Sequence, residues 1–385
     1  MPRAPRLLVL VTAALLSACA DDSPPPTDAP APSALVPDPS PLTRMTAEQY
    51  QNTVRDLFAP AEVGSVVFPA ELEGRGGFQN DVTLNTATPA LVESYQRVAR
   101  QVTDQLRHQF TTMLGCDVMA DGCARDALPG FAERAWRRPL AEDELQAMLA
   151  DFDGWAASSN PEIALTLSLQ SLLQSPEFLY FPRFGADAPA EGAPGIPLTS
   201  WELAARLSYF LWNSMPDEAL FERARDGSLL DRQVLADEAF RMLADGRAVD
   251  MVVSFHRQNW DFDDAGSNPI DLDFYAPVFE ARGMFAEDDK SDFYYLEYSP
   301  QLRFESDVFV SEHVFRGEGK LRTLLTSNRT WTSPLVAEIA YQSSVDENLE
   351  PVLWTALIPS EGNDTLQPFA GDYFPLELDP TRRAG

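Results

Sequence analysis

The chain contains few of the residues on which familiar catalytic and metal-binding motifs depend. Only three histidines and three cysteines occur among its 385 residues. The sequence has no G-x-S-x-G nucleophile turn, no H-E-x-x-H metal motif and no C-x-x-C-H haem-attachment motif. Gly319 and Lys320 resemble the end of a phosphate loop, but Val314 occupies the position of that loop's first glycine. The sequence therefore predicts no cofactor and no standard nucleophilic, zinc, haem or nucleotide chemistry.

Positive charge is also scarce. The chain has 29 lysine and arginine residues against 59 aspartate and glutamate residues, a formal charge of −30. Nucleic-acid binding needs a basic surface, and docking on anionic lipid headgroups needs clustered lysine and arginine. The composition therefore predicts no nucleic-acid partner. A hydrophobic fraction of 45% is ordinary for a globular protein, and the length allows two or three domains.

The N-terminus lacks an apolar run long enough to cross a membrane, yet it has the three parts of a signal peptide. Arg3 and Arg6 supply positive charge, residues 7–16 are mostly apolar, and small residues precede Cys19. A spanning helix would need roughly 20 apolar residues. Residues 16–19, Leu-Ser-Ala-Cys, resemble a bacterial lipobox. We expect residues 1–18 to be a signal peptide and Cys19 to carry a lipid that anchors the protein in a membrane. The alternative is an ordinary secretory signal followed by a cysteine.

Residues 19–41 are expected to form a tether after the lipid anchor. They are rich in proline, aspartate, serine and alanine, with almost no large apolar side chains, so they cannot bury enough surface to fold. Proline-rich linkers are extended and semi-rigid. Position 20 is alanine and not the aspartate that resembles an inner-membrane retention signal. We expect a protein of the cell envelope, with the outer membrane preferred and the body in the periplasm or outside the cell.

Cys116 and Cys123 are the remaining cysteines. In an oxidising compartment, two cysteines this close in sequence favour a disulfide. Closing so short a loop would stabilise the fold by about 2–3 kcal/mol in the chain-entropy model. A metal site is the alternative, but it would need two further ligands, and His108 is the only other histidine or cysteine nearby.

The body of the chain favours an all-α fold. Thr46 with Gln49 and Thr199 with Glu202 have the spacing of capping boxes, and no alternation of period two is long enough to indicate a sizeable sheet. Apolar residues recur at helical spacing, so we expect them to be buried. The expected buried positions are Tyr50, Val54, Leu57, Phe58, Leu203, Leu207 and the aromatic segments 178–181 and 209–212.

Proline and glycine divide the body into parts. The breaker-rich stretch 185–197 is expected to be a linker between an N-terminal helical region, 42–184, and a second helical domain, 198–342. Residues 343–385 are expected to form an irregular tail. Helices are predicted near 50–58, 89–113, 124–136, 141–155, 160–174, 217–226, 231–245, 247–260, 274–286, 300–315 and 333–342.

Residues 261–273 are the best candidate for a cation site, because calcium prefers clustered oxygens on a turning loop. The segment does not fit an EF-hand, since Ala265 and Leu272 stand where that loop needs oxygen ligands. The favoured interpretation is a solvated acidic loop without an ion. If the loop binds Ca²⁺, the candidate ligands are Asp261, Asp263, Asp264, Asp271 and Asp273.

His256 and His313 are the candidates for acid–base or metal chemistry. A pair of imidazoles would suit either role if the fold brought them together. The favoured alternative is that each histidine hydrogen-bonds within its own helix, because nothing in the sequence brings the two together.

Three arginines stand out against the acidic background. Arg134, Arg137 and Arg138 could receive an anionic ligand. The favoured interpretation is that they pair with the acidic residues 142–144 across the break at Pro139, which would fix the angle between two helices.

Several segments, in this order, resemble a known family. Residues 42–57 include LTRMTAEQY and TVRDL, residues 131–140 read FAERAWRRPL, residues 173–180 read LQSPEFLY, and residues 203–217 read LAARLSYFLWNSMPD. Together they resemble the multi-block domain-of-unknown-function family of secreted planctomycete and myxobacterial envelope lipoproteins, over about residues 42–342. The resemblance implies export and this domain order but no established activity.

Two departures from that family follow. Some relatives look fused to a cytochrome c domain, and the haem-attachment pattern of such a domain is absent here, which puts any haem role in doubt. Residues 376–385 look like the lead into a further family block, so the resemblance predicts a truncated member or a fragment.

Three functional interpretations remain. The favoured one is a non-catalytic binding or assembly scaffold at the cell envelope, with other envelope proteins as partners, because every standard catalytic motif is missing. The second is an accessory of an extracellular redox (cytochrome-linked) or polymer-degrading system, by analogy with the company such families keep. The third is an enzyme of unrecognised mechanism. A histidine beside carboxylates in a water-accessible pocket would favour the enzyme.

Overall fold

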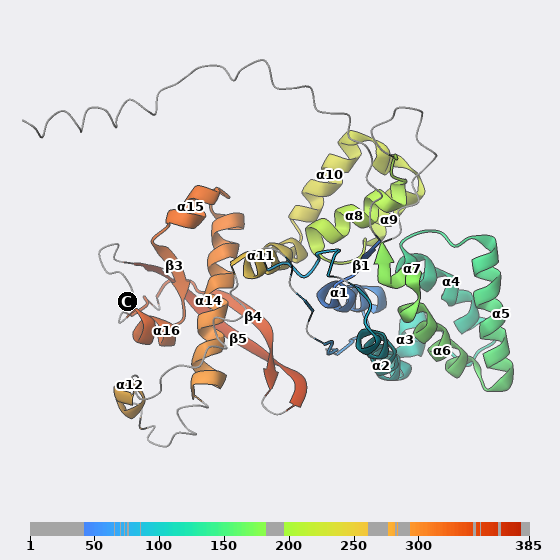
Figure 1. The fold of residues 1–385 in the computed structure, drawn as a ribbon, viewed down its shortest axis with the longest axis horizontal. Coiled ribbons are helices and arrows are strands. Elements are labelled where there is room, and N and C mark those ends of the chain that lie inside the picture. Colours follow the sequence, from blue (N-terminus) through green and yellow to red (C-terminus); the bar gives the residue numbers. More distant parts are fainter. Residues whose placement is uncertain are drawn as a thin grey trace, which may run out of the picture. The chain divides into compact units, whose positions relative to one another are not determined.

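Helices make up most of the computed structural model, which confirms the expected all-α class as mostly helical (Figure 1). The structure describes residues 42–181, 196–260, 276–283 and 293–378, without 65, 70, 73, 75–76, 85, 282, 342–343, 347 and 361–362. The predicted signal peptide, the tether with Cys19, the calcium loop and nearly all of the linker lie outside these residues. Those expectations therefore stay predictions.

The first group of helices begins at a capping box. The Thr46 hydroxyl accepts from the Gln49 amide at 3.2 Å, and the Gln49 side chain accepts from the Thr46 amide at 3.1 Å. Helices α2, α4 and α5 each pack against α6. The elements of this group are α1 (Ala47–Phe58), α2 (Pro89–Leu106), α3 (Phe110–Leu114), α4 (Cys123–Trp136), α5 (Glu142–Ser158), α6 (Pro161–Gln174) and α7 (Pro176–Leu179).

The core of this group combines aromatic and aliphatic side chains. The Tyr50 ring lies 5.1 Å from Phe68 and 5.3 Å from Phe178, both edge to face, an arrangement that favours aromatic pairs. On α6, residues such as Leu169 and Leu173 are fully buried. The four predicted core positions of α1, at 50, 54, 57 and 58, are all buried, as the helical spacing predicted.

A short ladder joins the start of the body to the end of this group. Strand β1 (Thr43–Arg44) pairs with β2 (Tyr180–Phe181) in an antiparallel two-stranded sheet. The Met45 amide also donates to the Leu179 carbonyl at 2.8 Å. This pairing holds Phe181 at a fixed place beside α8, where it lies edge to face with Tyr209 at 4.6 Å.

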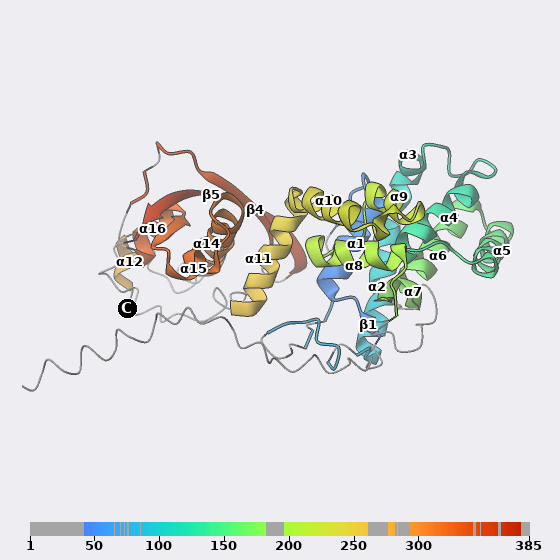
Figure 2. The ribbon, with the colours of Figure 1, turned by 90° about the horizontal axis from the view of Figure 1, so that it is seen from above.

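A second set of helices follows residue 197. Helix α8 (Ser200–Trp212) packs against α9 (Glu218–Arg225) and α10 (Arg232–Leu243), and Figure 2 shows the three side by side. Helix α11 (Gly246–Trp260) contacts both α8 and α10. The Trp212 indole is buried in this core and donates to the Met242 carbonyl at 2.8 Å, so its polar atom is satisfied.

One predicted core residue of α8 is exposed. The segment 209–212 was expected to be buried, and Tyr209, Leu211 and Trp212 are, but 72% of Phe210 is exposed. The buried face of α8 includes Ala204 and Ser208. At 3.6 residues per turn, Phe210 is rotated about 200° from Ser208 and so points away from that face. The prediction was wrong because a run of four aromatic and apolar residues covers more than one face of a helix.

The C-terminal part combines helices with a sheet, which corrects the expectation of an irregular tail over 343–385. Strands lie in the order β3 (Arg329–Thr332), β5 (Asn363–Glu377) and β4 (Val352–Ser360), all antiparallel. Helix α14 (Ser299–Ser311) packs on this sheet through Phe304 and Val308, with Tyr373 in the same core. The prolines and glycine at 368, 371 and 375 interrupt the alternation of β5, so the sequence resembled a loop.

The remaining described helices complete this part. They are α12 (Ala276–Ala281), α15 (Leu321–Thr326), α16 (Pro334–Ala340) and two π-helical turns, Phe293–Tyr298 and Glu312–Arg316. Apart from Ile196, the described residues belong to one unit by their contacts, Pro41–Asp187 with Pro197–Gly385. Within the described ranges, no helix is both long and apolar enough to span a bilayer.

Candidate functional site

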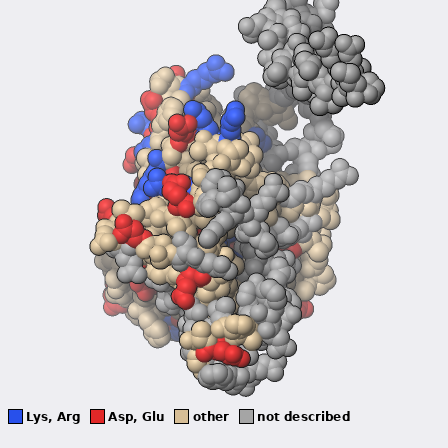
Figure 3. Space-filling view, turned by 90° about the vertical axis from the view of Figure 1, so that its left-hand side faces the viewer, with Lys and Arg blue, Asp and Glu red and all other residues tan. Residues whose placement is uncertain are grey.

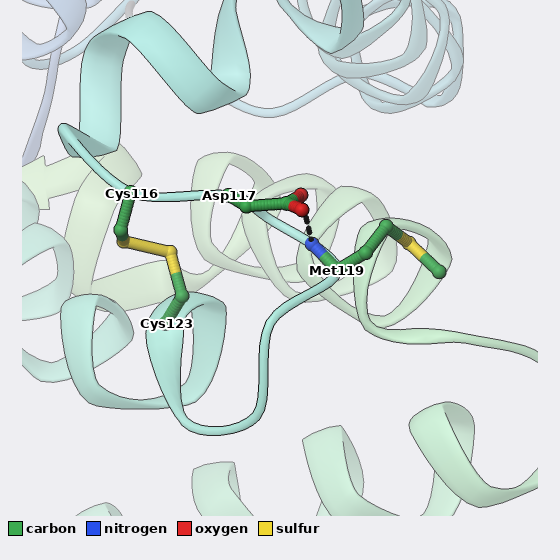
Figure 4. Close-up of a disulfide and its surroundings, with 4 residues drawn as sticks. All are labelled: Cys116, Asp117, Met119 and Cys123. Atoms are coloured by element: carbon green, nitrogen blue, oxygen red, sulfur yellow. Dashed lines mark hydrogen bonds between the residues drawn. A yellow bond between two sulfur atoms is a disulfide. The ribbon is translucent and has the colours of Figure 1, made fainter.

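The predicted disulfide is present. Cys116 follows α3, Cys123 begins α4, and their sulfur atoms are bonded, with Cα atoms 6.1 Å apart, within the usual range for a disulfide (Figure 4). Inside the loop, the Met119 amide donates to the Asp117 carboxylate at 3.0 Å. Bonding consumes both thiols, so these cysteines are not metal ligands in this structure.

The two candidate histidines each bond within their own helical segment, as the favoured alternative predicted. His256 Nδ1 donates to the Val252 carbonyl at 2.8 Å, and His313 Nδ1 donates to the Phe309 carbonyl at 2.9 Å. Each donates to the carbonyl four residues earlier. Over the part of the chain that the structure describes, no group of three histidine, cysteine, aspartate or glutamate side chains is placed to hold a metal ion.

Several surface arginines pair with carboxylates on neighbouring elements. Figure 3 shows lysine and arginine side chains gathered toward one end of the face that it draws, with aspartate and glutamate among them. Elsewhere, Arg125 pairs with Asp153 and Arg225 with Glu133, both at 2.8 Å, and each pair joins two helices. Exposed pairs of this kind contribute at most about 1 kcal/mol each. They hold helix positions and indicate no site.

Of the three clustered arginines, only Arg138 pairs with the acidic residues 142–144 as predicted. Arg138 forms a two-point ion pair with Glu144, at 2.7 and 2.8 Å, across the break between α4 and α5. Arg134 instead donates to the Asp56 carbonyl at 3.0 Å. Arg137 turns into the protein. The prediction that all three pair with residues 142–144 was therefore wrong for two of them, because the end of α4 points their side chains to different neighbours.

Arg137 is a buried cation held by carbonyl groups. It ends α4 in the left-handed conformation, with φ of 57°, and only 4% of it is exposed. Its guanidinium donates to the carbonyls of Ala135, Glu177, Phe178 and Tyr180 at 2.9–3.0 Å. The last three belong to α7 and β2, so one side chain satisfies carbonyls at the end of a four-residue helix.

Aromatic rings surround the same guanidinium. Its central carbon lies 5.3 Å from the Phe181 ring and 5.7 Å from the Tyr209 ring, within cation–π range. Burial lowers the pKa of Arg137, and the Tyr209 hydroxyl, which hydrogen-bonds it, opposes that shift. An arginine stays protonated in proteins. Among the described residues no carboxylate pairs with it, so a full positive charge is buried and is stabilised by carbonyl and hydroxyl dipoles and by aromatic rings.

A cavity of about 560 Å³ opens beside this arginine. That volume is within the range of small-molecule sites in proteins. Its first wall comes from the end of α4 and the connection to α5, and Phe181 of β2 adjoins it. The residues of this wall are Trp136, Arg137, Arg138, Pro139, Leu140 and Ala141.

The second wall is one face of α8, from Trp201 to Tyr209, and the residue that caps the helix. Glu202 accepts from the Thr199 amide at 2.8 Å and from the Thr199 hydroxyl at 3.0 Å, so its carboxylate is committed to the capping box that starts the helix. Arg206, one turn later, is exposed and bonds to no described residue. The residues of this wall are Thr199, Trp201, Glu202, Ala205, Arg206 and Tyr209.

Three family models match the chain, each described as a protein of unknown function. They are DUF1587 over residues 43–107, DUF1595 over residues 123–182 and DUF1592 over residues 198–341. The chain therefore carries these three domains in this order, and the first wall of the cavity lies in the second domain and the second wall in the third. No curated protein and no solved structure matches the chain.

The cavity was not predicted from the sequence. Its two tryptophans, Trp136 and Trp201, lie 65 positions apart, and each occupies a helix with an apolar face, which alone indicates core packing. The one available signal was the pair of adjacent arginines before Pro139, which an anionic ligand could explain as well as an ion pair.

Proposed function

We propose that this protein is a lipid-anchored binding protein of the bacterial cell envelope, and that its helical body holds a small molecule in the cavity between α4–α5 and α8. The observation that carries the proposal is the cavity itself, walled mainly by apolar and aromatic side chains with a few charged groups. Binding sites for small molecules are concave and mostly apolar, with few polar groups that fix orientation. The described walls hold no histidine or cysteine, and the hydroxyl of Thr199 is hydrogen-bonded within the capping box, which favours binding over nucleophilic chemistry.

The proposed location in the cell envelope rests on separate observations. Residues 16–19 have lipobox form after an apolar run, and the proline-rich residues 20–41 suit an extended spacer. The Cys116–Cys123 disulfide is consistent with an oxidising compartment outside the cytoplasm. The tether would hold the cavity away from the lipid surface and leave it open to molecules that diffuse through the envelope.

The lipid anchor predicts selective labelling of one cysteine. Cells grown with a palmitate analogue should label the wild-type protein and should not label Cys19→Ser, because only the lipobox cysteine accepts the lipid. Cys123→Ser is the matched control, since it removes a cysteine of the body and leaves residues 1–19 unchanged; it should label like the wild type. Equal labelling of the wild type and Cys19→Ser would refute the anchor.

The cavity predicts binding of a neutral apolar probe that a bulky substitution blocks. N-phenylnaphthylamine, whose fluorescence rises on leaving water, should bind the purified full chain. Ala205→Trp places an indole in the cavity and should weaken this binding by about tenfold, or about 1.4 kcal/mol.

The control for that experiment is Ala150→Trp, which adds the same side chain at an exposed position of α5. It should bind the probe like the wild type. Thermal melting would confirm that both variants are folded. If Ala205→Trp is folded and binds the probe as tightly as Ala150→Trp, the cavity is not the binding site.

A further inference from the structure

We propose that the cavity selects carboxylates borne on a flat aromatic body, with the ring system between the two tryptophan-bearing walls and the carboxylate at Arg206. This inference rests on the proposed function and deepens it by naming the class of ligand. It depends on three features of the cavity: the flat side chains that line it, the balance of charge in its walls, and the availability of one guanidinium at its edge.

Flat side chains line both walls of the cavity. Trp136 is held in place, because its indole donates to the Ser175 hydroxyl at 2.9 Å and Arg138 lies 5.2 Å from its ring. Trp201 is fixed by Phe221, whose ring centre is 5.8 Å away, and by Arg225 at 5.9 Å. Such rigid rings provide large contact area at low conformational cost, which favours a rigid, planar ligand over a flexible chain.

The charge of the walls has the opposite sign to that of the chain. Three arginines and one glutamate line the cavity, whereas the whole chain carries a formal charge of −30. The glutamate, Glu202, accepts two hydrogen bonds from Thr199 in its capping box. Arg137 adds a buried positive charge for which the described residues supply no carboxylate. Electrostatic interactions are stronger where water is excluded, so this charge favours an anion over a cation.

Only one of the three guanidiniums is available to a ligand. Arg137 donates its hydrogen bonds to backbone carbonyls, and Arg138 donates two hydrogen bonds to the Glu144 carboxylate. Arg206 is exposed and makes no hydrogen bond or ion pair to any residue that the structure describes. One free planar guanidinium matches one carboxylate, which it can hold through two parallel hydrogen bonds. A doubly charged phosphate would need more free donors than these walls supply.

A series of isosteric probes tests this inference. Naphthoate, naphthamide and naphthamidine share a ring system and differ in charge, being anionic, neutral and cationic. Calorimetric titration of the full chain should give an affinity for naphthoate about tenfold above that for naphthamide, and no measurable binding of naphthamidine. The preference should weaken with added salt, because Arg206 lies at the exposed edge and is screened.

Arg206→Gln should remove most of the preference for naphthoate and leave the affinity for naphthamide unchanged. Arg232→Gln is the matched control, since Arg232 is an exposed arginine of α10 outside the cavity; it should keep the wild-type preference. Equal affinity of the wild type for naphthoate and naphthamide, or equal effects of the two substitutions, would overturn the inference and leave the cavity a binding site. Failure of all three probes and of N-phenylnaphthylamine to bind would overturn the proposed function as well.

Discussion

Replacing Arg137 with methionine is expected to lower the free energy of unfolding by about 4 kcal/mol. Methionine fills a similar volume but donates no hydrogen bond, so four carbonyls that now receive one from the guanidinium lose it. An unsatisfied buried group costs about 1–3 kcal/mol, and removing a buried charge offsets part of the sum. Urea unfolding, followed by circular dichroism, would measure the change from the shift in midpoint at constant slope.

Two further substitutions, one at Arg138 and one at Arg137 itself, serve as comparisons for that measurement. Arg138→Met removes the adjacent arginine, whose pair with Glu144 is partly exposed, and should cost no more than about 1 kcal/mol. Arg137→Lys keeps the charge but replaces a planar fork with three donors on one atom, so its cost should lie between the other two. If the Arg137→Met and Arg138→Met variants are equally stable, the hydrogen bonds from Arg137 to the carbonyls of residues 177, 178 and 180 do not hold α7 and β2 in place.

The helices could be predicted from sequence because their signals are local. The capping boxes at Thr46 and Thr199 and the breaker at Pro139 each act within a few residues, and the structure places helix ends beside them. The hairpin of β4 and β5 could not, because Pro368 and Pro375 are breakers by the same local rules. What makes these residues strands is pairing with partners elsewhere in the chain, such as Trp331 opposite Pro375.

The candidate site was less predictable than the helices, because most of its contacts join residues that are far apart in the sequence. Cys116 and Cys123 are seven positions apart, so proximity alone indicated their bond. Three of the four carbonyls that Arg137 contacts are 40 or more positions away, at Glu177, Phe178 and Tyr180, and one sequence carries no sign of them. Neighbouring acidic residues therefore looked like its natural partners. The role of Arg137 can be recognised only in the folded chain, where residues 175–181 bring their carbonyl groups to its guanidinium.

A second buried charged group lies in the C-terminal part of the body. Glu305 on α14 is 5% exposed and accepts from the Thr330 hydroxyl at 2.8 Å, the Thr332 hydroxyl at 3.0 Å and the Tyr341 hydroxyl at 2.6 Å. No cation pairs with it among the described residues. Burial raises the pKa of Glu305 above its ordinary value of 4.5, and the three hydroxyl donors, Tyr341 first, counteract part of that rise.

A raised pKa in the folded state gives a stability that falls as pH rises. Below the ordinary value, the folded and unfolded chains both hold the proton on Glu305, and its contribution is fully present. Between that value and the raised one, the unfolded chain releases the proton while the folded chain keeps it. The free energy of unfolding then declines by up to about 1.4 kcal/mol for each pH unit until the folded chain ionises as well.

Glu305→Gln is therefore expected to abolish this decline, because an amide accepts from hydroxyls at every pH and never ionises. Urea unfolding of both proteins across acid to mildly alkaline pH would give the difference, in which other titrating groups cancel. Tyr341→Phe should act in the opposite direction: it removes the donor that most lowers the pKa of Glu305, so the decline should extend to higher pH. In the double variant, Tyr341→Phe should have no pH-dependent effect, since the group on which it acts is gone. Parallel stability curves for the wild type and Glu305→Gln would show that folding does not shift the pKa of Glu305.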